Sequence, residues 1–277
     1  MSRSLRFLDS GMHSGSHNMA LDETLLRAVQ DGAGPILRLY GWDPPAVSLG
    51  YAQDAETELD VSACSAAGVD LVRRPTGGRA VLHWQELTYS VVCSVDSVLF
   101  GPRIEDTYGV IGACLVAGLR RFGIEADLEE AQVRAPRPRL GSAALPCFSS
   151  TARSEVKWNG RKLVGSAQRR FSGAVLQHGS IVIGPAHEQL VDWLRISETQ
   201  RGQWRDRLRA DSACLEECVG EAVDRSDLVC SVAAGFSDLL KCELVYDEVR
   251  SDEWERSLER AAFWTVGDRY ARGHSIG

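Results

Sequence analysis

Lysine is scarce in this sequence, and a long apolar run and an export signal are both missing. Three of the 31 basic residues are lysines, Lys157, Lys162 and Lys241, so nearly all the positive charge is arginine and each lysine merits attention. The longest nearly unbroken apolar run, Val110–Gly118, is far shorter than the roughly 18 to 20 residues of a transmembrane helix. The first residues also lack the hydrophobic region of a signal peptide. We therefore expect a cytoplasmic protein with no membrane partner.

The composition excludes several classes of protein. Hydrophobic residues make up 44% and charged residues 25% of the 277 residues, which rules out a disordered chain, a collagen and a disulfide-stapled miniprotein. With 31 basic and 38 acidic side chains the net charge is −7, so we expect no nucleic-acid partner. No internal repeat or low-complexity linker divides the chain. These features predict one domain over residues 1–277.

Hydrophobic periodicity and turn residues predict that this domain is α+β. Helical spacing of apolar residues predicts helices over residues 18–30, 55–67, 105–122, 187–195, 226–242 and 251–266, the first capped by Asn18. Short apolar runs between turn residues predict strands over residues 35–40, 46–51, 69–73, 79–83, 87–95, 154–158, 162–171 and 174–183. The first two strands are expected to begin a meander, and the last three to form an antiparallel unit that turns at Asn159-Gly160. A mostly helical C-terminal part is expected to pack on this core.

Among the eight cysteines, Cys147 has the most unusual setting. It follows Pro146 in a loop of small residues and does not sit in an apolar helix or strand pattern. A free thiol has a pKa near 8.5 and becomes a good nucleophile only where a cation or hydrogen-bond donor favours the thiolate. Lys162, one strand and one hairpin away in the sequence, could supply that cation. Cys147 and Lys162 are therefore the candidate catalytic residues.

The other cysteines form no strong metal or disulfide pattern. Eight cysteines scattered through a mid-sized chain without an export signal predict mostly buried thiols. Cys214 and Cys218 are spaced i, i+4 ahead of Cys230 and Cys242, but the C-x₂-C pairs typical of structural zinc are missing. We expect no metal site.

Two segments hold more glycine and polar residues than a strand requires. In residues 73–83, the pair Gly77 and Gly78 can adopt positive φ and admit a ligand close to the backbone, beside several arginines. In residues 160–181, small residues interrupt one strand and a Gln-His-Gly sequence breaks the next, so a ligand could lie across both. A plain glycine turn and a pair of β-bulges would have the same patterns, and both readings stay open on the residues alone.

These segments, together with Asn18-Met-Ala-Leu-Asp22, resemble the catalytic domain of the lipoate-protein ligase and biotin-protein ligase superfamily. The stretches that carry the resemblance are residues 73–83, 160–169 and 176–181, in the family's order, and the similarity covers a catalytic core of about residues 5–240. Within the superfamily, Pro146-Cys-Phe-Ser-Ser ahead of the Lys162 segment is similar to the LipM-type octanoyltransferases, which use a cysteine there as acyl carrier. The resemblance implies an antiparallel-rich mixed sheet flanked by helices, with a helical C-terminal part.

The resemblance also implies a reaction. An octanoyl group would pass from acyl carrier protein to a lysine of the glycine cleavage H protein, or of a lipoyl domain of a 2-oxoacid dehydrogenase, without a cofactor. Cys147 would attack the thioester carbonyl and form an acyl-enzyme, and Lys162 would lower the pKa of the thiol. The residues expected to bind substrate, most of them lining an acyl tunnel, are Arg73, Arg74, Gly77, Gly78, His83, Gly165, Ser166, Ala167, Gln177, His178 and Gly179.

Three alternatives remain. An ATP-dependent lipoate-protein ligase would activate a free acid as an acyl-adenylate, but has no use for a nucleophilic cysteine. A non-catalytic acyl- or lipoyl-domain-binding module would keep the glycine motifs and lose Cys147 or Lys162, and both are present. Another octanoyltransferase type has its cysteine after the His-Gly segment, where Cys214 is the first candidate, and we rank Cys147 above it.

A local basic patch is expected to attract the acidic carrier and acceptor proteins that the resemblance implies. The chain itself is acidic, so long-range attraction has to come from clustered arginines near the proposed nucleophile. The candidates are Arg134, Arg137, Arg139, Arg161, Arg169 and Arg170.

Overall fold

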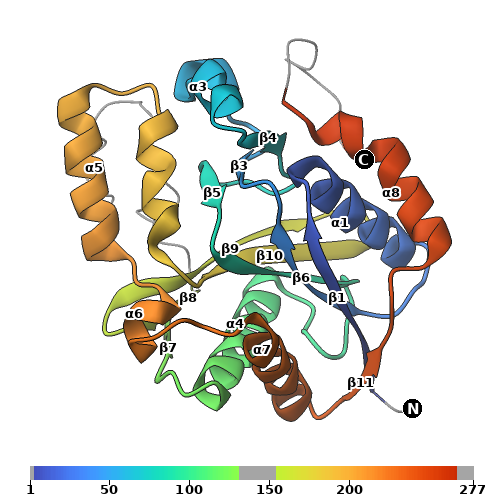
Figure 1. The fold of residues 1–277 in the computed structure, drawn as a ribbon. Helices are drawn as coiled ribbons and strands as arrows, with labels where there is room; N and C mark the ends of the chain where they lie inside the picture. Colours follow the sequence, from blue (N-terminus) through green and yellow to red (C-terminus); the bar gives the residue numbers. More distant parts are fainter. Residues whose placement is uncertain (1–2, 131–153, 267–277) are drawn as a thin grey trace.

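An eight-stranded mixed sheet forms the centre of the protein (Figure 1), seen in a computed structural model that describes residues 3–130 and 154–266. The β11–β1 and β1–β2 pairs are parallel and the other five neighbouring pairs are antiparallel. The predicted antiparallel-rich α+β fold is therefore confirmed. In spatial order the strands are β11 (Glu243–Tyr246), β1 (Ser4–His13), β2 (Ile36–Trp42), β6 (Glu86–Ser94), β10 (Ala174–Val182), β9 (Arg161–Arg170), β8 (Ser154–Trp158) and β7 (Asp127–Glu130).

A second, three-stranded sheet lies beside the first. Its order is β4 (Asp70–Arg73), β3 (Ala46–Leu49), β5 (Val81–His83). The predicted meander is wrong, because β2 and β3 belong to different sheets. The reason is that β2 is hydrogen-bonded on both edges, to β1 and to β6, and has no edge left for β3.

Two pairs of helices cover the faces of the large sheet (Figure 1). The pair α1 (Gly15–Gln30) and α8 (Ser251–Trp264) lies on one face, and α4 (Ile104–Arg121) and α7 (Arg225–Leu240) lie on the other. Successive side chains of β2 point to opposite faces of the sheet, so β2 packs against both layers of helices. Ile36 packs in the α1 cluster, whereas Leu37 packs in the α4 cluster.

Shorter helices surround the small sheet and depart from the predicted helices. Where one helix was predicted over residues 55–67 there are two, α2 (Ala55–Glu58) and α3 (Val61–Ala66). Between them Leu59 is extended and buried, and the Asp60 carboxylate accepts a hydrogen bond from the Ala63 amide and starts α3 afresh. Two more helices here are η2 (Pro185–Trp193), which is a 3₁₀ helix, and α5 (Glu198–Asp211), whereas α6 (Leu215–Val219) packs against the core of the large sheet.

The C-terminal helix α8 packs on α1, and the C-terminal part also contributes a strand. β11 pairs in parallel with β1 and closes one edge of the large sheet, between α7 and α8 in the sequence. Within the described residues, no helix is both long and apolar enough to cross a membrane.

Candidate active site

A pocket lies where the small sheet meets β9 and β10 of the large sheet. Its empty volume is about 440 Å³, part of which is open solvent. One part of the wall is apolar and comes from Met19, Tyr40, Trp42 and Val81. The rest is polar or glycine-rich and comprises Ser48, Arg74, His83, Thr88, Gly165, Ser166, Ala167, His178, Gly179 and Ser180.

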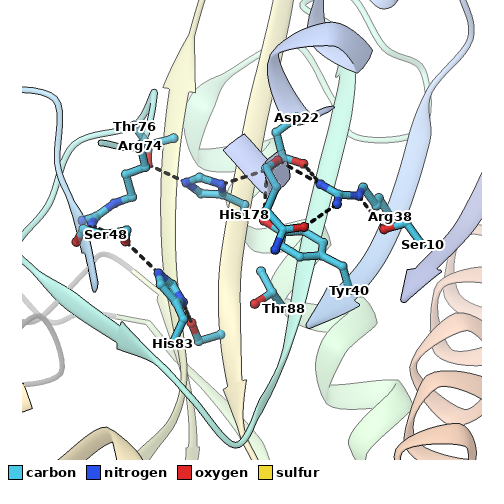
Figure 2. Close-up of polar contacts among 12 residues, drawn as sticks. Ser10, Asp22, Arg38, Tyr40, Ser48, Arg74, Thr76, His83, Thr88 and His178 are labelled. Carbon is cyan, nitrogen blue, oxygen red and sulfur yellow. Dashed lines mark hydrogen bonds and ion pairs between the residues drawn. The ribbon is translucent and has the colours of Figure 1, made fainter. Parts of the chain in front are cut away.

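His178 of β10 is buried in this wall and held at both ring nitrogens (Figure 2). Nε2 lies 2.7 Å from Thr76 Oγ1, and Nδ1 lies 3.2 Å from Asp22 Oδ2. Burial lowers the pKa of His178 below its ordinary value, although Asp22 opposes the shift, so the ring is neutral at pH 7. A neutral ring facing a carboxylate carries its proton on Nδ1, and Nε2 then accepts from the Thr76 hydroxyl. This contact ties the loop after β4 to the large sheet.

Asp22 is in turn paired with Arg38, and neither side chain is exposed to solvent. Arg38 Nη1 lies 2.8 Å from Asp22 Oδ1, and the Tyr40 hydroxyl donates to Asp22 Oδ2 at 3.1 Å. Burial by itself would raise the pKa of Asp22, but His178 and Arg38 outweigh it and hold the pKa below its ordinary value. The carboxylate is therefore charged, and its charge is already matched by a cation.

Asn18 belongs to the same network, and its predicted role as a helix cap is wrong. Helix α1 begins at Gly15, one turn earlier, so Asn18 lies inside the helix. Its side-chain oxygen accepts from Arg38 Nη2 at 2.7 Å and its amide donates to the Gly41 carbonyl at 2.9 Å. The spacing of Asn18 and Asp22 therefore places both on the face of α1 that meets Arg38.

His83 of β5 occupies the other side of the pocket (Figure 2). Its Nε2 lies 2.7 Å from Ser48 Oγ, and its Nδ1 lies 2.8 Å from Glu86 Oε1. The Ser180 hydroxyl donates to the same Glu86 oxygen at 2.9 Å. The Trp42 indole stacks on the imidazole with ring centroids 4.0 Å apart and an interplanar angle of 12°. The ring is thus held at both nitrogens and on one face.

Arg73 and Arg74 of the glycine motif bind main-chain carbonyl groups and shape the loops around the pocket. Gly78 has the predicted positive φ, +100°. Of the substrate-binding residues predicted in this motif, Arg74 and His83 line the pocket, whereas Arg73, Gly77 and Gly78 do not. Arg74 donates to the carbonyl oxygens of Ser48, Gly77 and Arg79, and Arg73 to those of Gly50, Tyr51 and Gln53.

The small residues of β9 and β10 face each other as expected. Gly165, Ser166 and Ala167 pair with Ser180, Gly179 and His178 respectively. A Cβ on Gly179 would lie 2.2 Å from the Gly165 carbonyl oxygen, so only glycine fits there. Gln177 points to the opposite face of the sheet, away from the pocket, and donates to the Tyr89 hydroxyl at 3.0 Å.

Lys162 is buried near the start of β9 and is paired with Glu155 of β8. Nζ lies 2.9 Å from Glu155 Oε1, and the two side chains are 4% and 7% exposed. Lys162 is not among the residues that line the pocket. Glu155, the partner of Lys162, follows the predicted nucleophile Cys147 by eight residues in the sequence.

Cys147 lies in the segment 131–153, outside the described residues, so its role stays a prediction. The alternative nucleophile, Cys214, is buried, and burial raises the pKa of its thiol. Burial likewise raises the pKa of Cys64 to about 11 and of Cys93 and Cys218 to about 12. These thiols are poor nucleophiles at neutral pH. In the described ranges no group of three or more His, Cys, Asp or Glu side chains is arranged to bind a metal.

The described members of the predicted arginine patch are each tied to a protein partner. Arg161 forms an ion pair with Glu217, with Nη1 3.0 Å from Oε2. Arg169 donates to the Pro75 carbonyl at 3.0 Å, and Arg170 to the Val95 carbonyl at 3.1 Å. The other three candidates, Arg134, Arg137 and Arg139, fall outside the described residues, and docking of an acidic carrier stays a prediction.

Several residues of the site were missed by sequence reasoning: Asp22, Arg38, Tyr40, Trp42, Ser48, Thr76, Glu86 and Ser180. One signal was available. Arg38 is a charged residue in an otherwise apolar strand, and Asp22 lies between Leu21 and Leu25 on an apolar helix face. Charges in such places are seldom buried without a partner.

The lipoyl protein ligase A/B catalytic domain matches residues 14–237 of this sequence. The chain belongs to this family. Within the lipoyl protein ligase A/B family it is 42% identical to octanoyltransferase LipM of Kyrpidia tusciae over 259 residues, which cover 93% of this chain and 94% of that one. It is 38% identical to octanoyltransferase LipM of Moorella thermoacetica over 265 residues, covering 95% and 96% of the two chains.

Solved structures of lipoate-protein ligases in the family share the fold. A bipartite lipoate-protein ligase from Thermoplasma acidophilum, described with its E2 lipoyl domain, superposes with a TM-score of 0.76 at 25% identity, over 94% of this chain and 92% of that one. A lipoate-protein ligase A bound with ATP superposes with a TM-score of 0.75 at 25% identity, over 94% of each chain. Together the comparisons confirm the predicted family, the predicted fold and the predicted enzyme class, an octanoyltransferase.

Proposed function

We propose that this chain transfers an octanoyl group from acyl carrier protein to a lysine of a lipoyl domain, or of the glycine cleavage H protein, through a thioester on Cys147. The observation that carries the proposal is the two-sided wall of the pocket. Met19, Tyr40 and Trp42 offer apolar surface for an acyl chain, and the glycine-rich and polar side of the wall faces them across the pocket. The archaeal ligase described with its E2 lipoyl domain supports an acceptor of that kind.

The proposed reaction proceeds in two acyl transfers. The Cys147 thiolate attacks the carbonyl carbon of the donor thioester, the carbon–sulfur bond to the carrier breaks, and the carrier leaves as a thiolate that takes a proton from solvent. The acceptor amine then attacks the same carbon, the bond to Cys147 sulfur breaks, and an amide forms. The Lys162 ammonium favours the thiolate and the developing oxyanion. Glu155 holds this ammonium at 2.9 Å and orients it.

The test is the intact mass of the protein after incubation with octanoyl-acyl carrier protein in the absence of ATP. We expect one added octanoyl group that hydroxylamine removes, and its loss in Cys147→Ala. Cys230→Ala is the matched control, because Cys230 is an exposed cysteine of α7 and should leave the adduct intact. An adduct that requires Cys214, or a strict requirement for ATP, would overturn the proposal.

A further inference from the structure

Two histidines of the pocket wall are held by matching sets of partners (Figure 2). In each set a carboxylate lies at Nδ1 of the ring and a hydroxyl lies at Nε2, the order in which hydrolases arrange a hydroxyl, a histidine and an acid. The ring can therefore accept a proton from its hydroxyl at Nε2 while the carboxylate at Nδ1 stabilises the imidazolium. The two sets are Asp22, His178 and Thr76, and Glu86, His83 and Ser48.

The two sets differ in the charge next to the carboxylate. Asp22 is already paired with Arg38 at 2.8 Å, so a proton on His178 would add a second positive charge to a buried, compensated cluster. Glu86 accepts hydrogen bonds from His83 and from the Ser180 and Thr88 hydroxyls. Across the described chain, the ion pair that Glu86 forms is with His83. A proton on His83 would therefore meet an unmatched carboxylate at 2.8 Å.

Other groups that face His83 do not cancel this effect. Arg74 is a cation close to this set, and its Nη1 lies 3.0 Å from Ser48 Oγ, so it acts on the ring from beyond that hydroxyl. Coulomb energy falls with distance, so the carboxylate in direct contact outweighs it. His178, across the pocket, is neutral at pH 7 because burial lowers its pKa. Trp42, stacked on the ring, and Ser180, 3.4 Å from Nδ1, carry no charge.

The second acyl transfer needs a group that accepts a proton. A lysine side chain has a pKa of about 10.4, so at neutral pH the acceptor arrives as an ammonium ion with no lone pair to attack the acyl carbon. One proton has to leave before the carbon–nitrogen bond can form. A histidine with a carboxylate partner is suited to take it.

We propose that Ser48, His83 and Glu86 form a relay that takes this proton from the acceptor ammonium. The inference rests on the proposed function. The ammonium gives a proton to Ser48 Oγ as Ser48 gives its own to His83 Nε2, and Glu86 stabilises the imidazolium. The freed amine attacks the acyl carbon, the carbon–sulfur bond breaks, and the departing thiolate takes the second amine proton as the amide forms. His83 then releases its proton to water. Ser48 is the member that touches substrate, and His83 and Glu86 act through it.

Two nucleophiles of different basicity separate this role from a structural one. Preformed acyl-enzyme is mixed either with a lipoyl domain or with hydroxylamine, which is largely unprotonated at neutral pH and needs no base. In His83→Gln and Ser48→Ala, transfer to the lipoyl domain at pH 7 should fall by about 100- to 10,000-fold, the usual contribution of a general base. Release by hydroxylamine should stay within about 3-fold. The deficit with lysine should shrink about tenfold for each unit of pH towards the pKa of lysine.

Further variants separate the effect of losing the Glu86 charge from an effect on folding. Glu86→Gln keeps an oxygen for His83 and the hydroxyls but removes the charge, and should show the same pH-dependent deficit on a smaller scale. His17→Gln is the matched control, because His17 is also buried and bonded to a serine hydroxyl but lies against α8. Formation of the acyl-enzyme itself reports whether each variant is folded.

The outcomes are distinct. Equal slowing with both nucleophiles, a deficit that does not change with pH, or unimpaired transfer in both His83→Gln and Ser48→Ala would overturn the relay and leave the proposed function standing. Failure of the unaltered protein to form an acyl-enzyme would overturn the proposed function, and the relay with it.

Discussion

The Asp22 carboxylate and the Arg38 guanidinium form an ion pair that is sealed from solvent, with 0% exposure of both side chains and an oxygen–nitrogen distance of 2.8 Å. The guanidinium carbon also lies 3.8 Å from the centre of the Tyr40 ring. Because both charges have lost their hydration, each depends on the other for compensation. Because of this pair, the carboxylate beside His178 already has a cation partner. The carboxylate beside His83 has no such arginine partner among the described residues, and this difference distinguishes the two histidines of the pocket.

Asp22→Ala should lower the free energy of unfolding by about 3 to 5 kcal/mol, because it leaves the Arg38 charge buried without its partner. Urea unfolding followed by circular dichroism measures the change. Asp9→Ala is the control, since the Asp9–Arg225 pair is about one-third exposed and should contribute no more than about 1 kcal/mol. Similar losses in the two variants would contradict the special role of the buried pair.

Lys162 and Glu155 should shift the reactivity of Cys147 in opposite directions. Lys162→Ala removes the proposed cation, so the pH midpoint of iodoacetamide labelling at Cys147 should rise towards the free-thiol value of about 8.5. Glu155→Gln removes the anion that pairs with Lys162 at 2.9 Å and should lower the midpoint. Lys162→Arg should restore the low labelling midpoint of Cys147 only poorly, because a guanidinium differs from an ammonium in reach and geometry. Midpoints that do not move would limit Lys162 to a contact with substrate.

Gly179→Ala should destabilise the sheet and impair activity. The new Cβ would lie 2.2 Å from the Gly165 carbonyl oxygen and 3.0 Å from Ser166 Cα, and backbone atoms cannot turn aside. We expect a loss of about 1 to 3 kcal/mol, typical of overpacking. Gly109→Ala, inside α4 with no atom within 4 Å of the new Cβ, should instead gain about 0.5 to 1 kcal/mol. Thermal unfolding of the two variants compares them, and equal effects would show that the close approach is not rigid.

The contact between α1 and α8 should weaken in acid. His17 lies 2.9 Å from the Ser257 hydroxyl and its ring packs on Trp254, and burial lowers the pKa of His17 to about 4. The folded state therefore keeps His17 neutral where the unfolded chain, with a pKa of about 6.5, binds a proton. Stability is complete above pH 6.5, falls as the pH drops towards about 4, and levels off below; the loss is about 3 kcal/mol at most.

Urea unfolding between pH 7.5 and pH 4.5 checks this prediction. His17→Gln should be less stable at pH 7.5 but should lose less stability on acidification, since a glutamine side chain binds no proton. Parallel pH profiles for the two proteins would show that other groups control the acid response.

Local features of the fold were predictable because neighbouring residues decide them. The turn at Asn159-Gly160 joins β8 and β9 as expected, since both residues adopt the positive φ that this dipeptide favours. The ends of α4 and α7 fall within one or two residues of those expected from apolar spacing. From the family resemblance, the glycine motifs, His83 and His178 were expected at one site. Both histidines line the pocket.

Other features depend on segments that are distant in the sequence. The strands β1 and β11 escaped prediction, and their pairing with each other and with β2 is set by which sheet edge remains open. The break between α2 and α3 arises because Leu59 is drawn into the core beside Leu194, overriding helix propensity. Tertiary packing, and not the local sequence, determines these strand pairings and this helix break.

The candidate site shows the same division. The sequence by itself determined which side chains are predicted to carry chemistry, namely the Cys147 thiol, the Lys162 ammonium and the two imidazoles. Only the tertiary structure decided the partners of the two imidazoles, by placing Asp22, itself paired with Arg38, beside His178 and Glu86 beside His83. The physical reason is that a pKa depends on burial and on charges within a few ångströms, and those charges come from strands far apart in the chain.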